Sequence, residues 1–239
     1  LAEEFIKPQQ HIQKTAVLIG DGGGPWGHYA REITRLLSAL GIKMIGQFPG
    51  YMPIRELSSI GHAQASIILG SNGQSDSNLI KLADLLQERF GINRLPGSLY
   101  PIGWGKTQEW LIAVGKLFSC EDKVRPLLAE EKNRLIAACS KFLPVTASKA
   151  TILCIGRSLL YFNPAAIIEI IDILQMQLKG IILLEGGYSD SKDYQMMLDT
   201  VRQCTDVPIY KNKLMNMEQL DADIILTTHE LQNYSIKQI

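Results

Sequence analysis

A glycine-rich segment after the first apolar run is the part of the sequence best suited to hold a ligand. Residues 20–28 read Gly-Asp-Gly-Gly-Gly-Pro-Trp-Gly-His, between a strand-like run at 16–19 and a segment of helical period. Glycines let the backbone approach a ligand closely, and a helix N-terminus offers free N–H groups and a partial positive charge to a phosphate or carboxylate. The candidate binding residues here are Asp21, Gly22, Gly23, Gly24, Trp26 and His28.

The same segment matches the dinucleotide-binding pattern G-x-G-x-x-G over residues 22–27, although it contains no Walker A sequence. A dinucleotide fold also needs an acidic residue at the end of the second strand to hold the ribose, and that strand ends in Gln47 and Phe48. Turns from strand to helix favour glycine for their own geometry, so a packing turn is the favoured interpretation. His28 is either a ligand or proton donor, or, as we favour, a surface or packing histidine.

Polar residues after other predicted strands are further candidates. Ser71 and Asn72 follow the third strand and offer hydroxyl and amide groups, although a polar turn that caps the next helix is the favoured alternative. Trp104 either lines a pocket or packs under its loop, and the sequence does not choose between these. In the second half, the candidates are Arg157 for an anionic group, Glu185 as a loop anchor and, more weakly, His229. No nucleophile, base and orienting group can be combined, so no catalytic residue is assigned.

The four cysteines do not form a metal-binding motif. Cys120, Cys139, Cys154 and Cys204 are separated by 19, 15 and 50 residues, which excludes a C-x-x-C pair, a zinc ribbon and a contiguous iron–sulfur motif. We predict no metal ligand and read them as reduced cysteines of a cytoplasmic protein. The chain starts at Leu1 with nothing that resembles a signal peptide, so we expect it to be cut from a longer protein.

The composition excludes several classes of protein. Lys+Arg and Asp+Glu both number 24, so the net charge is zero and the long-range attraction of a dedicated nucleic-acid or anionic-membrane binder is absent. With 46% apolar residues the chain can fold around a sizeable core. The longest uncharged stretch, residues 57–75, is interrupted by polar residues, so we predict no membrane span and neither a nucleic-acid nor a membrane partner.

The elements that must position these residues alternate between short β-type runs and segments of helical period. Before residue 120, the predicted strands are 16–19, 43–48 and 65–69, and the predicted helices are 29–40, 53–60, 76–90 with Ser75 or Asp76 as N-cap, and 107–118. A long helix is predicted over 121–142, followed by strands at 151–155, 180–184, 207–210 and 224–227 and helices at 164–178 and 190–203. This pattern predicts an α/β fold of two Rossmann-like units, each a parallel sheet flanked by helices: a first domain at 1–120, a connecting helix and linker at 121–148, and a second, truncated domain at 149–239.

The succession of segments resembles a known family. It includes Ala-Val-Leu-Ile-Gly-Asp at 16–21, the glycine-rich segment, Arg-Leu-Leu-Ser-Ala-Leu-Gly-Ile at 35–42, Ala-Gln-Ala-Ser-Ile-Ile-Leu at 63–69, Glu-Arg-Phe-Gly-Ile at 88–92, and Pro-Ile-Gly at 101–103 followed by Thr107 and Trp110. In this order they resemble the component 1 type proteins of nitrogenase, which include molybdenum–iron protein subunits, cofactor scaffolds and dark-operative chlorophyllide-type reductases. The resemblance is good over 15–118 and mainly architectural over 121–239.

The resemblance implies a three-domain subunit of a heteromeric oxidoreductase or cofactor-assembly complex, of which this chain supplies the second domain and most of the third. The implied partners are a homologous or paralogous component 1-type subunit and an ATP-dependent iron protein that delivers electrons. The chain would then form part of a metallocluster or tetrapyrrole pocket and of a subunit interface, and the implied cofactor of the complete protein is an iron–sulfur cluster or related metallocluster. The family's cluster-binding cysteines lie mostly in the first domain, and this chain reads Gly70-Ser71-Asn72 where many relatives have a cysteine, so we expect no cofactor and no activity in the chain alone.

Two other classes stay open from the sequence. One is a two-lobed module that binds a small molecule or a nucleotide sugar. The other is a non-catalytic interaction subunit that keeps the fold for assembly alone.

Overall fold

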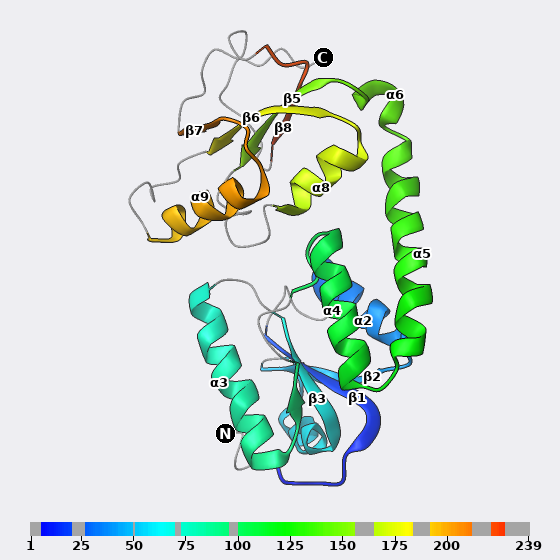
Figure 1. Ribbon diagram of the computed structural model, residues 1–239. Helices are drawn as coiled ribbons and strands as arrows, with labels where there is room; N and C mark the ends of the chain where they lie inside the picture. The colour runs from blue at the N-terminus through cyan, green and yellow to red at the C-terminus, as the bar shows by residue number, and fades with distance from the viewer. Residues whose placement is uncertain are drawn as a thin grey trace. The chain divides into compact units, whose positions relative to one another are not determined.

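Two parallel β-sheets, each packed against helices, organise the chain (Figure 1). The computed structural model describes residues 6–20, 27–49, 51–69, 73–95, 100–155, 165–183, 192–211 and 221–227. The chain divides into two compact units, Leu1–Glu131 and Lys132–Ile239, so that the division falls inside one long helix. The α/β class with two parallel sheets flanked by helices is therefore confirmed, whereas the domain limits at 120 and 149 stay a prediction.

The first unit is built on a sheet of strand order β2-β1-β3-β4, in which every neighbouring pair is parallel. Its elements are β1 (Ile12–Ile19), α2 (His28–Ala39), β2 (Lys43–Phe48), η1 (Ile54–His62), β3 (Ala63–Ile68), α3 (Gly73–Phe90), β4 (Asn93–Arg94), α4 (Trp104–Leu117) and the first part of α5 (Glu121–Ser140).

Strand β1 lies in the middle of this sheet and contributes side chains to a hydrophobic core on each face. Ala16 and Leu18 point into a core formed with α2, α4 and the start of α5, whereas Val17 and Ile19 point into a core formed with η1 and α3. This alternation follows from the period of two in a strand, and because both faces are covered the strand reads as an unbroken apolar run. Figure 1 shows α3 on one side of the sheet and α4 on the other.

Helix α2 ends as its sequence predicts, at Gly41. The backbone N–H of Gly41 donates to the carbonyl of Ser38 and that of Ile42 donates to the carbonyl of Leu37, both at 2.9 Å. Gly41 has a φ of +80°, so the helix closes with the paired hydrogen bonds of a Schellman motif, which favours glycine at this position. Ile42, fully buried, then leads directly into β2.

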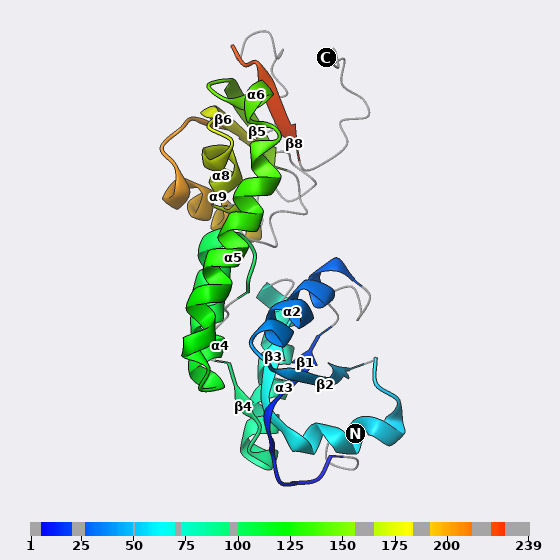
Figure 2. The same ribbon diagram turned by 90° about the vertical axis from the view of Figure 1, so that its right-hand side faces the viewer.

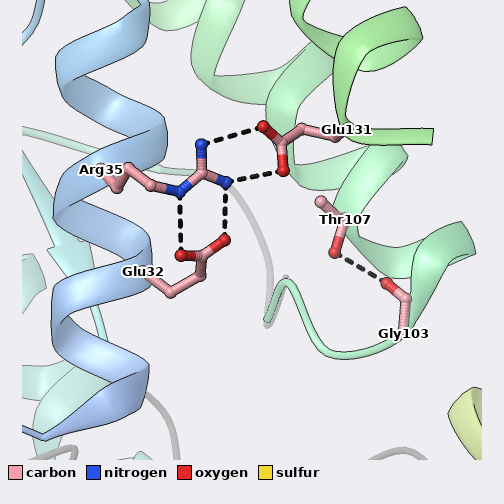
Figure 3. A network of polar contacts seen from close by, with 5 residues as sticks. All are labelled: Glu32, Arg35, Gly103, Thr107 and Glu131. Carbon is pink, nitrogen blue, oxygen red and sulfur yellow. Dashed lines mark hydrogen bonds and ion pairs between the residues drawn. The ribbon is translucent and has the colours of Figure 1, made fainter. Parts of the chain in front are cut away.

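The first part of α5 is fixed to the first unit by packing and by charge. Val124 and Leu127 are buried in the core beside α2 and α4. Arg35 of α2 donates to both carboxylate oxygens of Glu131, at 2.9 and 2.6 Å, and to both of Glu32, at 2.9 and 2.6 Å. Figure 3 shows the guanidinium lying between the two carboxylates. Bidentate hydrogen bonds of this kind fix the orientation of the side chains as well as stabilising the contact, so α5 is held against α2 up to Glu131.

The second unit repeats the same architecture with a different strand order, β7-β6-β5-β8, again parallel throughout. Its elements are α6 (Leu143–Thr146), β5 (Ala150–Ile155), α8 (Ala165–Ile173), β6 (Gln177–Leu183), α9 (Lys192–Cys204), β7 (Ile209–Lys211) and β8 (Ile224–Thr227). Residues of α8, α9 and the end of α5 pack on one face of this sheet. Figure 2 shows α8 and α9 on the same side of the strands.

Several predicted boundaries differ from the structure. Helix α3 begins at Gly73, so neither Ser75 nor Asp76 is its N-cap, and α4 begins at Trp104 rather than at 107. The long helix ends at Ser140, and a short helix, α6, follows it. The helix predicted to reach residue 178 ends at Ile173, and the next strand begins at Gln177.

No helix in the described part of the chain is long and apolar enough to cross a membrane.

Candidate functional site

The order of the strands in the first sheet defines an edge where a ligand can bind. From β1 the chain crosses to β2 on one side of the sheet and then returns past β1 to β3 on the other side. The helices that follow β1 and β3, α2 and α3, therefore pack on opposite faces of the sheet. In open parallel sheets, ligands bind at such a switch point, outside the carboxyl ends of the strands. We call the carboxyl ends of β1 and β3 the switch edge.

Hydrogen bonds at the switch edge fix where the two segments begin. Ile19, the last residue of β1, lies opposite Phe48 of β2 and Ile68 of β3. The N–H of Gly20 donates to the carbonyl of Phe48 at 2.8 Å, and the N–H of Leu69 donates to the carbonyl of Ile19 at 2.7 Å. The glycine-rich segment and the segment after β3 thus start side by side.

Gly20 is required at this point for two reasons. Its φ of +117° lies in a region that side chains with a Cβ rarely adopt. A Cβ added there would lie 2.7 Å from the carbonyl oxygen of Leu69, which is too close for any side chain. The glycine therefore allows the two backbones to meet at the switch edge.

Gln47 is the residue at this edge whose role the sequence alone did not reveal. Its side chain is buried, and Nε2 donates to the carbonyl of Gly20 at 2.8 Å. The position where a dinucleotide fold places its ribose-binding acid thus holds an amide that fixes the start of the glycine-rich segment. The only signal in the sequence is a polar residue near the end of an otherwise β-type run. A nucleotide site of the ordinary type is not supported by this arrangement.

The N-terminus of α2 is electropositive. Gly27 is the N-cap and has no side chain with which to cap the helix, and the first turn contains no acidic residue. His28 begins the helix and is exposed, and its Nδ1 lies 3.0 Å from Nη2 of Arg31, which is also exposed. An arginine at this end opposes the helix dipole unless an anion is nearby, so the arrangement suits a ligand with negative charge.

Only some of the candidate residues predicted from the sequence lie in the described part of the chain. His28 is at the start of α2, as expected, while Asp21, Gly22, Gly23, Gly24, Trp26, Ser71 and Asn72 lie outside the described residues. Arg157, Glu185 and His229 lie outside them as well. Trp104, expected in a loop, is the half-buried first residue of α4, and Gly103 with φ +85° precedes it. Figure 3 shows how the Thr107 hydroxyl closes this first turn by donating to the carbonyl of Gly103, at 2.7 Å.

A thiolate-bound iron cluster does not fit the residues at the switch edge. The first unit contains one cysteine, Cys120, which follows α4. The C-terminal end of α4 lies at the opposite edge of the sheet, because the carbonyl of Leu117 accepts from Gln64 of β3, whose Oε1 accepts from the N–H of Lys14 of β1. These two residues belong to the amino ends of their strands, so no sulfur ligand of this unit reaches the switch edge.

A hollow of about 590 Å³ on α4 does not belong to this edge. Its described lining residues are all on α4: Glu109, Ile112, Ala113, Lys116 and Leu117. They occupy the half of the helix that runs toward the amino ends of the strands. The hollow is therefore separate from the candidate site.

The fold and the switch edge define a class of protein. Its members contain two Rossmann-like units, and in each unit a ligand would bind at the carboxyl ends of the parallel strands. The family model described as nitrogenase component 1 type oxidoreductase matches residues 1–239. This chain belongs to that family. The expectation drawn from the order of its segments is confirmed.

Solved structures agree with this assignment at the level of the fold. The chain is similar to the structure titled "Nitrogenase Cp1 at pH 6.5", with 14% identity and a TM-score of 0.54, over 91% of this chain and 43% of that one. It is also similar to "Nitrogenase Cp1 at pH 5", with 13% identity and a TM-score of 0.54, over 92% of this chain and 49% of that one. The chain therefore spans less than half the length of these nitrogenase chains. No curated protein matched it in sequence.

Proposed function

We propose that this chain forms one wall of a cofactor pocket in a heteromeric oxidoreductase or cofactor-assembly complex, and that the switch edge is its contribution to that pocket. The observation that carries the proposal is the close approach of Gly20 and Leu69, the residues at which β1 and β3 end beside each other at the switch edge. Membership of the nitrogenase component 1 type family is what makes a metallocluster or a tetrapyrrole the bound group that we propose.

The chain's own residues would orient such a group rather than bond to its metal. The N-terminus of α2 and the exposed Arg31 favour a negatively charged face, such as the carboxylates of a tetrapyrrole or the net charge of a cluster. Gln47 keeps the start of the glycine-rich segment in place by its bond to the Gly20 carbonyl. The bound group would supply the electron-transfer chemistry, whereas these residues would hold it and set its orientation.

The proposal includes partners and a location. A homologous or paralogous component 1-type subunit would complete the pocket, and an ATP-dependent iron protein would deliver electrons. Both belong to the cytoplasm, where we place the complex. The family match supports a component 1-type assembly, and the iron protein is part of the proposal.

The test is the retention of the cofactor by charge-reversed variants of the complex. Arg31→Glu places a carboxylate at the N-terminus of α2, and we expect about a tenfold loss of affinity for the bound group, the size of one charge-assisted contact. Lys43→Glu is the matched control, because Lys43 is an exposed cation at the amino end of β2. Absorbance and metal content per protein, after anaerobic purification and a dilution series, measure the retained group.

The outcomes separate this function from others. Loss in Arg31→Glu with retention in Lys43→Glu supports the pocket. Equal retention in both variants, or a purified complex that carries neither metal nor chromophore, contradicts it. A small molecule or a nucleotide sugar that raises the unfolding temperature of the chain would instead indicate a binding module, and complex formation without any ligand would indicate an interaction subunit.

A further inference from the structure

The placement of the four cysteines conflicts with the cofactor chemistry of the family to which the chain belongs. We infer that none of them ligates an iron–sulfur cluster, and that the thiolates for any cluster in the complex come from outside residues 1–239. This inference rests on family membership and on the positions of the thiols, and it does not require the proposed pocket to exist.

Iron–sulfur clusters are held by several cysteine thiolates that converge on one point. All four cysteines of the sequence lie within the described residues, and none of them forms a disulfide with another. No group of three or more His, Cys, Asp or Glu side chains in the described part of the chain is arranged to hold a metal ion. The chain therefore contributes at most isolated thiols, each of which could only be a single ligand.

Cys120 is a structural residue at the corner between α4 and α5. It is 1% exposed and packs in the core of the first unit. Its N–H donates to the carbonyl of Gly115 at 2.9 Å, and its own carbonyl accepts from the N–H of Lys123 at 3.1 Å, so it fixes the turn between the two helices. Burial raises the pKa of its thiol, which disfavours the thiolate that iron needs.

Cys139 and Cys154 belong to the second unit but lie on opposite faces of its sheet. Cys154, in β5, packs with Ile152 and Ile182 on one face, whereas Cys139, on α5, packs with Leu153 of the other face. The strands themselves separate the two sulfur atoms. Cys154 is 1% exposed, and burial raises the pKa of its thiol to about 11.

Cys204 is the most accessible of the four but is in a poor electrostatic environment for a ligand. It is the last residue of α9 and is half-buried. Burial and, to a smaller extent, the negative charge of Glu169 raise the pKa of its thiol. A reactive or metal-binding cysteine has the opposite surroundings, with positive charge beside an exposed sulfur.

The first experiment uses Co²⁺ as a probe of thiolate ligation in the 239-residue chain. Under anaerobic conditions, we expect titration with Co²⁺ to give no thiolate-to-cobalt charge-transfer absorption. Cys204→Ser serves as the comparison, because the most accessible thiol is the first that a metal would meet. A charge-transfer band in the wild-type chain that disappears in Cys204→Ser, or in Cys120→Ala, Cys139→Ala or Cys154→Ala, would overturn the inference.

The second experiment uses the wild-type complex, so that it does not depend on the folding of any variant. Cysteines are alkylated before and after removal of iron by a chelator, and labelled peptides are measured by mass spectrometry. We expect labelling at residues 120, 139, 154 and 204 to be unchanged by chelation, because these thiols were not covered by iron. A peptide of this chain that becomes labelled only after chelation would refute the inference. A complex without iron would count against the proposed pocket, and the cobalt titration would then decide the inference alone.

Discussion

Cys154 shows how burial alone sets the chemistry of a residue. Cys154 lies inside the β-type run predicted at 151–155, and its side chain is 1% exposed in the structure. Burial raises the pKa of its thiol from 9.0 to about 11, because the thiolate cannot be hydrated there. The residue is therefore a small apolar side chain at neutral pH.

This raised pKa predicts a loss of stability in alkali. Below pH 9 the thiol is protonated in the folded and the unfolded chain, and its contribution is fully present. As the pH rises toward 11, the unfolded chain ionises first, so the free energy of unfolding falls, by on the order of 2 kcal/mol for a shift of this size. Denaturant unfolding of the wild-type chain and Cys154→Ala across this range measures the effect.

The variant should be less stable than the wild-type chain at neutral pH, since it leaves a small cavity. The free energy of unfolding of the wild-type chain should then fall by about 2 kcal/mol relative to that of Cys154→Ala as the pH rises from 9.0 to about 11. A constant difference at every pH would show that Cys154 keeps its ordinary pKa in the folded chain.

At the scale of elements, the corner between α4 and α5 depends on a close approach of the two helices. Gly115 lies within α4 and is buried, and a Cβ there would lie 2.5 Å from Cγ2 of Val124 and 3.5 Å from Cα of Glu121. Valine is stiff at χ1 and cannot turn away without strain. The small residue at 115 thus sets the distance between the helices.

Gly115→Ala tests this corner. In an exposed helix the change would stabilise by about 1 kcal/mol, but overpacking a core costs about 1–3 kcal/mol, so we expect net destabilisation. The double variant with Val124→Ala should recover part of the loss, because the smaller side chain makes room. Thermal unfolding of the two single variants and the double variant gives the coupling energy. Additive effects would mean that the two residues do not compete for the same space.

Element boundaries show which sequence signals are strong and which are weak. Gly41 and Gly91 directly follow the helices predicted at 29–40 and 76–90, and both have a positive φ. The helix that begins at Ala165 was predicted too long, because apolar residues keep recurring as far as Leu178. Its chain reverses at Gln175, which has a φ of +54° without being glycine. A turn of this kind leaves no mark in the sequence, so periodicity alone could not find it.

At the scale of the molecule, each unit has hydrophobic cores of its own. Leu37 is fully buried between α2 and the first sheet, and Leu183 is fully buried in β6 of the second. The cores of the first unit draw on α5 residues up to Leu128, and the core on the helix face of the second sheet draws on Leu135 and Cys139. Helix α5 thus contributes side chains to a core of each unit.

Separate cores predict separate responses to a cavity. Leu37→Ala should destabilise the first unit by about 2–5 kcal/mol and raise hydrogen exchange in β1, α2 and β2, with the protection of β5 and β6 unchanged. Leu183→Ala should do the reverse and is the matched control. Hydrogen exchange followed by mass spectrometry resolves the two units. Increased exchange in both units of either variant would show that they unfold as one.

The sequence by itself determined the α/β class, the described strands other than the two-residue β4, most helix ends and the family, because these depend on local periodicity, turn residues and their order. It also marked the glycine-rich segment. Only the tertiary structure decided that this segment starts beside Leu69, that Gln47 holds it, and that Cys120 lies at the far edge of the sheet. Strand order and register bring together residues far apart in the chain, and no local pattern encodes which strands become neighbours.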